Sequence, residues 1–275
     1  LGIDLSAVPA DPSDGRVSRD AVATYVRQRL AASSSKSAET ALSPAAQVPT
    51  SVKRMSGMRG TIAKRMHSSL QQMAQLTLTM DADLDNVVAD RQSREGDEVV
   101  PGFTDYVIAA AARALRAHPI VNSQVTDDGI ALLPDVHVGL AVALDEGLVV
   151  PVVRNADRID LVTLAKETKR LATAARNGNL ALGDLEGGTF SVSALGMFGV
   201  DAFTPVINPP NTAILGVGRL RDDLVLGAKG KVTSVKRLTL SLTWDHRVFD
   251  GAPAAQFGQS IVSFLADPAS LDRSA

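Results

Sequence analysis

The chain has 275 residues, enough for one large domain or two modest ones with a substantial core. Hydrophobic residues make up 45% and charged residues 21%, which excludes a wholly disordered chain, and a net charge of -2 provides no general basic surface for nucleic acid. The absence of cysteine excludes disulfides, thiolate metal sites and a cysteine nucleophile. Apolar runs such as residues 108–115 are far shorter than the ~20 residues of a membrane helix, so no membrane partner is expected.

The first 32 residues predict a loop rich in Pro, Asp and Gly followed by one short amphipathic helix. Ser18 can cap this helix. Its inner face would be formed by Val22, Tyr25, Val26 and Leu30. Because the first residue is a leucine, we expect the protein to begin upstream of it.

A linker is expected next, over residues 33–51 (SSSKSAETALSPAAQVPTS). Serine, alanine, threonine and proline dominate this stretch, so it cannot bury enough apolar surface to offset the entropy of ordering. The linker would join residues 1–32 to a main domain over residues 52–275.

The main domain opens with a predicted helix over residues 57–73. Its apolar side chains recur at helical spacing, and we expect them to face the core. They are Met58, Ile62, Met66, Leu70 and Met73. A strand over residues 76–84 and a polar helix over residues 85–94 follow.

Helices and short strands interleave irregularly in the rest of the chain. Thr104 can cap an alanine-rich helix that runs to Pro119, and Asp160 can cap a helix over residues 161–177. A last amphipathic helix is expected over residues 252–266. The expected strands are 120–125, 130–133, 136–144, 148–153, 188–195, 212–218, 223–227 and 235–244. This order predicts an α/β fold with a mixed β-sheet covered by helices.

The segment TWDHRVFDGAP concentrates ionisable residues after an apolar strand. A histidine such as His246 can move a proton to or from a bound nucleophile. Asp250, four residues later, can fix the local loop through an arginine such as Arg247, Arg59 or Arg65. The alternative is a hydrogen-bonded histidine at a strand end and an aspartate that caps a turn or helix. These residues alone leave both interpretations open.

A glycine-rich stretch, residues 187–218, contains two serines that alternate onto the same face of a predicted strand. Either Ser191 or Ser193 can offer a hydroxyl to a developing oxyanion. Alternatively, the stretch is a glycine-rich hairpin with two ordinary serines. No Gly-x-Ser-x-Gly turn surrounds either residue, which weakens a serine-hydrolase interpretation.

Metal and nucleotide chemistry lack their sequence motifs. The spacing of His67, His118 and His137 is not that of metal ligands, and we expect no metal site. No Gly-x-x-x-x-Gly-Lys-[Ser/Thr] run is present to hold a nucleotide phosphate.

Four stretches together resemble the dihydrolipoamide acyltransferase (E2) component of 2-oxo acid dehydrogenase complexes, over roughly residues 52–272. They are MSGMRGTIAKRMHSSL, HVGLAVALDEGLVVPVVRNAD, GGTFSVSALGMFGVDAFTPVINPPNTAILGVG and WDHRVFDGAPAAQF. The resemblance implies a chloramphenicol-acetyltransferase-like two-layer fold. It also implies transfer of an acyl group between dihydrolipoamide and coenzyme A.

The same resemblance assigns roles to three residues. His246 would be the general base, Ser193 rather than Ser191 would stabilise the oxyanion, and Asp250 would orient the local structure. Because the histidine of one family subunit faces the serine of its neighbour, a homotrimer is expected, and trimers would assemble into a larger core. The residues that contact coenzyme A stay unassigned.

Residues 1–32 resemble the latter part of the family's peripheral subunit-binding domain, although ADPSDG departs from the usual glycine-rich loop. The implied partners are the E1 and E3 components of the complex. The implied lipoyl group would be carried on a lipoyl domain upstream of this chain. A bacterial cytoplasm is the expected location, with the mitochondrial matrix as the alternative.

The acyl group is expected to be acetyl, because LGMFGVDAFTPVINPPNTAILGVG resembles members of pyruvate or acetoin complexes. Branched-chain and acetoin-complex acyltransferases are alternatives. An acyltransferase like chloramphenicol acetyltransferase would not need the linker and the N-terminal segment. An inactive scaffold protein is disfavoured because His246, Asp250 and Ser193 are all present.

Overall fold

The computed structural model describes residues 7–10, 15–38, 51–52, 54–145, 147–227 and 230–272. It divides the chain into two compact units, Leu1–Arg54 and Met55–Ala275, which are described separately. No described helix combines the length and the apolar character that crossing a membrane requires.

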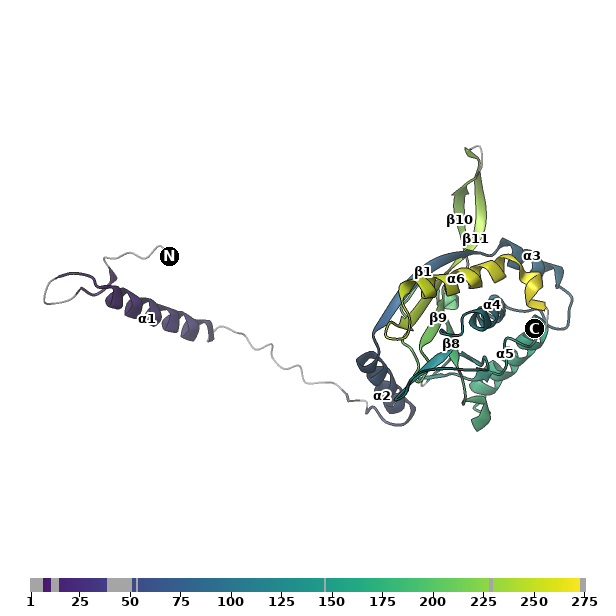
Figure 1. Ribbon diagram of the computed structural model, residues 1–275, viewed down its shortest axis with the longest axis horizontal. Coiled ribbons are helices and arrows are strands. Elements are labelled where there is room, and N and C mark those ends of the chain that lie inside the picture. Colours follow the sequence, from purple (N-terminus) through teal and green to yellow (C-terminus); the bar gives the residue numbers. More distant parts are fainter. Residues whose placement is uncertain are drawn as a thin grey trace. The chain divides into compact units, whose positions relative to one another are not determined.

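In the smaller unit, the described residues form the helix α1 (Arg19–Ala38), drawn in purple in Figure 1. Ser18 caps it as predicted, because the backbone N–H of Ala21 donates to the Ser18 hydroxyl over 3.2 Å. Val22, Tyr25 and Val26 are half-buried. The helix includes residues 33–38, which we expected in the linker, and residues 39–50 of that predicted linker lie outside the described residues.

The larger unit contains the helices and strands expected for an α/β fold. The helices are α2 (Gly57–Gln72), α3 (Asp85–Ser93), α4 (Phe103–Ala117), α5 (Leu161–Arg176), α6 (Gly251–Ala266) and the short η2 (Leu182–Asp184), η3 (Gly196–Phe198) and η5 (Pro268–Asp272). The strands are β1 (Gln75–Asp83), β2 (Ser123–Thr126), β3 (Gly129–Leu132), β4 (Val138–Leu140), β5 (Val142–Leu144), β6 (Gly147–Val149), β7 (Val152–Val153), β8 (Phe190–Ala194), β9 (Ala213–Val217), β10 (Arg221–Leu226) and β11 (Val232–Asp245). These bounds follow the predicted order, except that the predicted strands 136–144 and 148–153 are each divided in two, with β4 and β7 in the main sheet and β5 and β6 in a separate one.

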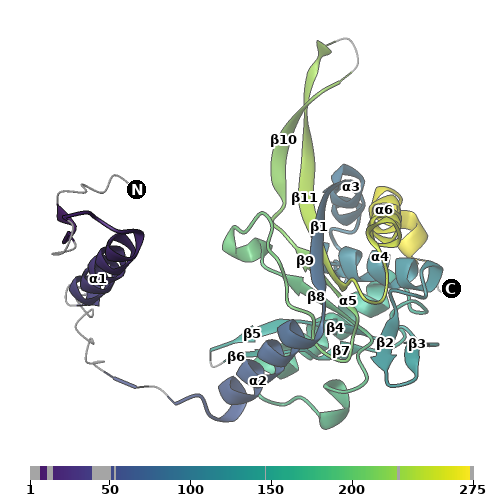
Figure 2. The ribbon, with the colours of Figure 1, turned by 60° about the vertical axis from the view of Figure 1, so that its left-hand side comes forward.

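The main sheet has the order β1-β11-β9-β8-β4-β7, and β10 pairs with β11. β8 runs parallel to β4 and β9, whereas the other pairs are antiparallel, so the mixed sheet predicted from the sequence is confirmed. β10 and the first part of β11 form a hairpin that projects beyond the other strands (Figures 1 and 2). The smaller pairs β2-β3 and β5-β6 form separate sheets.

The two faces of the main sheet differ because successive strand residues point to opposite sides. One face packs its apolar side chains against α4 and α6, which lie with α3 on one side of the strands in Figure 2. This face includes Val192, Leu215, Leu240, Leu242 and Trp244. The opposite face is largely polar and includes Thr77, Ser191, Ser193, Ser241, Thr243 and Asp245.

Two local predictions need correction. The predicted face of α2 does not enter the core, since Met58 and Leu70 are 41% and 54% exposed and Ser69 is its buried residue. Helical spacing identifies a shared face, but it does not say what lies against that face. Thr104 does not cap α4, because Gly102 occupies the N-cap and its backbone N–H donates to the Asp105 carboxylate over 2.7 Å.

Asp160 does cap α5, as predicted. Its carboxylate accepts from the backbone N–H of Thr163 over 2.8 Å and from the Thr163 hydroxyl over 2.7 Å. Asn177 is the C-cap and Gly178 adopts a positive φ of 69°, which a glycine tolerates at a helix end. These contacts fix both ends of the helix that forms one wall of the site described next.

Candidate active site

The histidine singled out in the sequence begins the turn between β11 and α6. The backbone N–H of His246 donates to the carbonyl of Ala74 over 2.9 Å. Its side chain is 41% exposed, and Nδ1 lies 3.6 Å from Oδ1 of Asp250, too far for a hydrogen bond. The imidazole centroid lies 5.8 Å from the ring of Trp244. The ring therefore rests on the sheet end and leaves one edge open to the outside.

Asp250 is the N-cap of α6, but its side chain forms no capping hydrogen bond and is 85% exposed. Among the arginines expected to hold it, Arg247 pairs with Asp245 instead. The structure thus brings His246 and Asp250 near each other on one turn, while a different carboxylate holds that turn.

Asp245, the last residue of β11, has a fully buried side chain. Its Oδ1 accepts from the backbone N–H groups of Ala74 and Arg247, over 3.2 and 3.1 Å. The Arg247 guanidinium donates through Nε to both oxygens over 3.0 Å and through Nη2 to Oδ2 over 2.6 Å. Burial opposes ionisation of Asp245, but these hydrogen bonds outweigh it and lower the pKa of the carboxyl. The carboxylate is therefore charged and fully engaged.

The two serines lie on β8 and share the polar face of the sheet, as predicted. Ser193 faces Gly216 in register, and its side chain lines two cavities. Ser191 is buried at 3% exposure and lines the second of these cavities. Ser193 is therefore the serine at a junction between two hollows.

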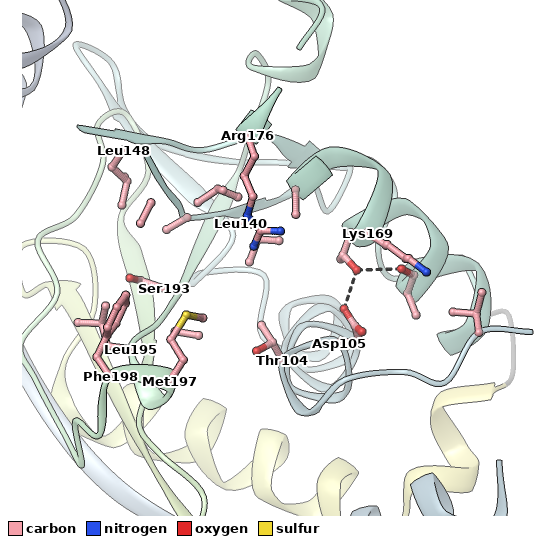
Figure 3. Close-up of a pocket in the computed structure, with 18 of the residues that line it drawn as sticks. Thr104, Asp105, Leu140, Leu148, Lys169, Arg176, Ser193, Leu195, Met197 and Phe198 are labelled. Carbon is pink, nitrogen blue, oxygen red and sulfur yellow. Dashed lines mark hydrogen bonds between the residues drawn. The ribbon is translucent and has the colours of Figure 1, made fainter. Parts of the chain in front are cut away.

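The first hollow, the α5 cavity, has a volume of about 540 Å³ and lies against one face of α5. Lys169 and Arg176 line it from that helix, and Figure 3 shows Ser193 and Phe198 on the side opposite Lys169. Its apolar wall includes Leu140, Ala141, Leu148, Leu195, Met197 and Phe198. The cavity therefore combines cations at one side with an apolar wall and a hydroxyl at the other.

The cations of the α5 cavity differ from others on the same helix. Lys166 pairs with Glu98, and Arg170 pairs with Glu167 and Asp184. The side chains of Lys169 and Arg176 form no ion pair or hydrogen bond in the described part of the chain. Two cations that form no ion pair with the described residues are suited to an anionic ligand.

A half-buried carboxyl, that of Asp105, lines the α5 cavity, and Figure 3 draws its hydrogen bond with Thr168. The Thr168 hydroxyl donates to Asp105 over 2.6 Å. Burial raises the pKa of Asp105 despite this bond and the one from Gly102.

The second hollow, the α2 cavity, has a volume of about 550 Å³ and is mostly apolar. Its walls include Met58, Ile62, Met66, Leu148, Phe203, Pro205, Val206 and Ile214, with Arg65 and Ser193 among its polar residues. The predicted apolar face of α2 thus forms a cavity wall. Ser193, Ala141 and Leu148 line both cavities.

Ser193 and His246 do not meet within one chain. Ser193 is in register with Gly216, and Gly216 with Ser241 on β11, five residues before His246. At about 3.3 Å per residue and about 4.8 Å per strand, the two residues are separated by roughly 16 Å along the strands and two strand spacings across them. The hydroxyl and the imidazole therefore belong to different places on this chain.

Sequence reasoning missed three residues of this site. Asp245 had a usable signal, because an acidic residue at the end of an apolar strand needs a buried partner. Lys169 and Arg176 gave no distinct signal, since their spacing shows only a shared helix face. Within the described residues, no group of three or more His, Asp or Glu side chains is placed to hold a metal ion.

Comparison with known proteins identifies a family. The model for 2-oxoacid dehydrogenases acyltransferase (catalytic domain) matches residues 47–272. The acetyltransferase component of the acetoin cleaving system of Bacillus subtilis is 39% identical over 277 residues, covering 98% of this chain and 67% of that protein. The succinyltransferase component of the B. subtilis 2-oxoglutarate dehydrogenase complex is 35% identical, with the same coverage of each chain. The chain thus spans about two thirds of these relatives.

Solved structures agree with this match. The cubic core of the pyruvate dehydrogenase multienzyme complex superposes with a TM-score of 0.78 at 32% identity, covering 82% of this chain and 96% of that one. The dihydrolipoamide acetyltransferase (E2p) of Azotobacter vinelandii gives a TM-score of 0.75 at 32% identity, covering 80% and 94%. That structure was solved to study the roles of a serine, a histidine and an asparagine in its catalytic mechanism.

Proposed function

The chain belongs to the acyltransferase family of 2-oxoacid dehydrogenase complexes, and we propose that it transfers an acyl group between dihydrolipoamide and coenzyme A using residues of two copies. One observation carries the proposal: Ser193 lies where two cavities meet, while His246 projects from a distant turn of the same chain. A second copy is the simplest source of a base for this junction.

Each group has a defined chemical role in the proposal. His246 takes the proton of the attacking thiol as the thiolate adds to the thioester carbonyl. The Ser193 hydroxyl donates to the oxyanion of the tetrahedral intermediate. When the intermediate collapses, the leaving thiolate takes the proton back from His246, so no atom or charge is left over. Both thiols come from the substrates, which suits a chain without cysteine.

Asp250 is the carboxylate proposed to orient the imidazole. Its Oδ1 lies 3.6 Å from Nδ1, and a closer approach in the assembled protein would let it accept a hydrogen from Nδ1 and leave the lone pair on Nε2 free. The A. vinelandii protein was studied for a histidine and an asparagine, and an asparagine can hold the same tautomer without a charge. Asp250 would therefore orient the ring rather than accept the proton.

The two cavities would receive the two substrates from different sides of Ser193. Coenzyme A fits the α5 cavity, because its phosphates match Lys169 and Arg176 and its pantetheine arm matches the apolar wall. The dihydrolipoyl arm with its acyl group fits the largely apolar α2 cavity. That lining favours an uncharged acetyl group over a succinyl group, and rates with acetyl-, isobutyryl- and succinyl-coenzyme A would test this choice.

A homotrimer is the assembly proposed for the main domain, with trimers joining into a larger core of the kind solved for pyruvate dehydrogenase. In a closed ring, the histidine of each copy can serve the serine of the next. Residues 1–32 would bind the E1 or E3 components, residues 33–51 would link them to the domain at 52–275, and the lipoyl group would come from a domain outside this chain.

Mixing two inactive variants tests the proposal directly. His246→Ala chains keep Ser193, and Ser193→Ala chains keep His246, so sites between unlike copies can regain both groups. If equal amounts are unfolded together and reassembled, about a quarter of the sites should be complete. Recovery of about that fraction of activity is expected, with each variant refolded alone as the control. No recovery in correctly assembled mixed particles would contradict a site shared between copies.

A further inference from the structure

We propose that Asp245 is a positioning residue that sets the orientation of His246 through a buried ion pair with Arg247. This inference rests on the proposed function of His246 as the base. It adds a further requirement, which is that a buried charge, that of Asp245, holds the turn that carries His246.

All the donors to the Asp245 carboxylate come from the two residues that flank His246 in space. The Arg247 backbone and guanidinium supply most of them, and the Ala74 backbone N–H supplies the other. The carbonyl of Ala74 in turn accepts from the His246 N–H over 2.9 Å. The Asp245 carboxylate thus holds both Arg247, the residue after the histidine, and Ala74, against which the His246 backbone lies.

Apart from the Trp244 ring, whose centroid lies 5.8 Å from that of the imidazole, the described residues offer few other contacts that could orient the ring. The backbone N–H of Val248 donates to the carbonyl of Asp245 over 2.9 Å, which closes the turn but does not direct a side chain. The Asp250 carboxylate is 3.6 Å from Nδ1 of the imidazole and exposed. A base that must reach a second copy needs its direction fixed before that copy is in place.

A purely structural ion pair elsewhere in the chain offers a matched comparison. Asp157 has a side chain with 2% exposure and pairs with Arg116, whose side chain is 46% exposed. The corresponding values are 0% for Asp245 and 48% for Arg247. Both are buried aspartates beneath a half-exposed arginine, but the arginines that pair with Asp157, Arg116 and Arg158, lie outside the turn that carries His246.

The test compares Asp245→Asn with Asp157→Asn in the assembled protein. Asp245→Asn should lower kcat at least about tenfold, a loss of about 1.4 kcal/mol in transition-state stabilisation. The KM values for coenzyme A and dihydrolipoamide should stay within about twofold, since no substrate contact changes. Asp157→Asn should lower the thermal midpoint while kcat is kept. Equal kcat for the two variants would overturn the inference.

A double variant distinguishes a positioning role of Asp245 from a general loss of structure in the Asp245→Asn variant. In a His246→Ala background, Asp245→Asn should cause no further loss of the residual rate, because its effect passes through the missing ring. An additive loss would show that Asp245 acts by another route. If His246→Ala itself kept full activity, the proposed base would be wrong. If that variant were inactive and Asp245→Asn fully active, only the positioning role would fail.

Arg247 provides a second route should Asp245→Asn fail to fold. Arg247→Gln leaves the carboxylate with two backbone donors, and it should lower kcat with KM unchanged. Arg247→Lys restores a charge without the two-pronged guanidinium, and should recover part of the loss. If Arg247→Gln folds and assembles with wild-type kcat, the ion pair has no influence on the base.

Discussion

The turn that carries His246 and the strand that carries Ser193 are built in opposite ways. The turn exposes the imidazole and buries an ion pair beneath it, whereas β8 lies within the sheet and Ser193 lines two cavities. Under the proposed function, the imidazole must extend from its own chain to reach another copy, so it loses the packing that would otherwise hold it. A hydrogen-bond donor gains strength in a dry site and needs only a rigid strand.

The largest effect on kcat should come from a change in the turn that carries His246. His246→Ala removes the base, and general acid–base catalysis is worth about 10² to 10⁴ in rate. Loss of kcat near the upper end of that range is expected, because a free thiol at neutral pH is mostly protonated. Steady-state kinetics on particles of confirmed size would measure it. Near wild-type turnover would show that the turn does not carry the base.

Ser193→Ala should cost less and should leave measurable activity. A single oxyanion donor contributes a factor of about 10² to 10³, and the imidazole remains in place. Ser191→Ala is the matched control on the same strand face, since Ser191 lines only one of the two large cavities. A greater loss for Ser191→Ala than for Ser193→Ala would reverse their assignment.

The contrast also explains what the sequence could and could not predict. The strand 76–84 and the Asp160 cap were predictable because alternation and capping are local patterns. The role of Asp245 depends on Ala74, which lies 171 residues away and contacts it only after β1 pairs with β11. Thr104 was wrongly chosen as a cap because the glycine before the helix carries no side-chain signal.

The two cavities could not be predicted from the sequence, for a related reason. The spacing of Met58, Ile62 and Met66 correctly gave one helix face, but a hollow and a core can have the same apolar lining. The serine pair was recognisable from alternation on one strand. That Ser193 stands between two hollows depends on loops and helices that approach β8 from several parts of the chain.

The cations of the α5 cavity should affect binding more than turnover. Lys169→Gln or Arg176→Gln should each raise the KM for coenzyme A by roughly tenfold, as expected for loss of one charge-assisted phosphate contact. The value of kcat should change little, and added salt should reduce the difference from wild type. Lys166→Gln is the control, because Lys166 already pairs with Glu98. Unchanged KM in both cavity variants would remove coenzyme A from this hollow.

The smallest effect should come from Asp160, which supports α5 but lies in neither functional region. Asp160→Ala should reduce the free energy of unfolding by about 1 kcal/mol at pH 7, the usual value for an N-cap. Hydrogen bonds from the backbone N–H and hydroxyl of Thr163 lower the pKa of Asp160 in the folded chain. Its stabilisation is therefore present above the unfolded-state pKa, about 3.9, and is lost as the pH falls through the folded value.

Denaturant unfolding of wild type and Asp160→Ala from pH 7 downwards should show the two stabilities converging in acid. The kcat of the variant at pH 7 should stay at the wild-type value, since neither the turn nor β8 is altered. A stability difference that grew as the pH fell would contradict the charge-dependent cap. A fall in kcat without loss of stability would instead couple the start of α5 to the reacting groups, and the two regions could then no longer be treated as the sole determinants of turnover.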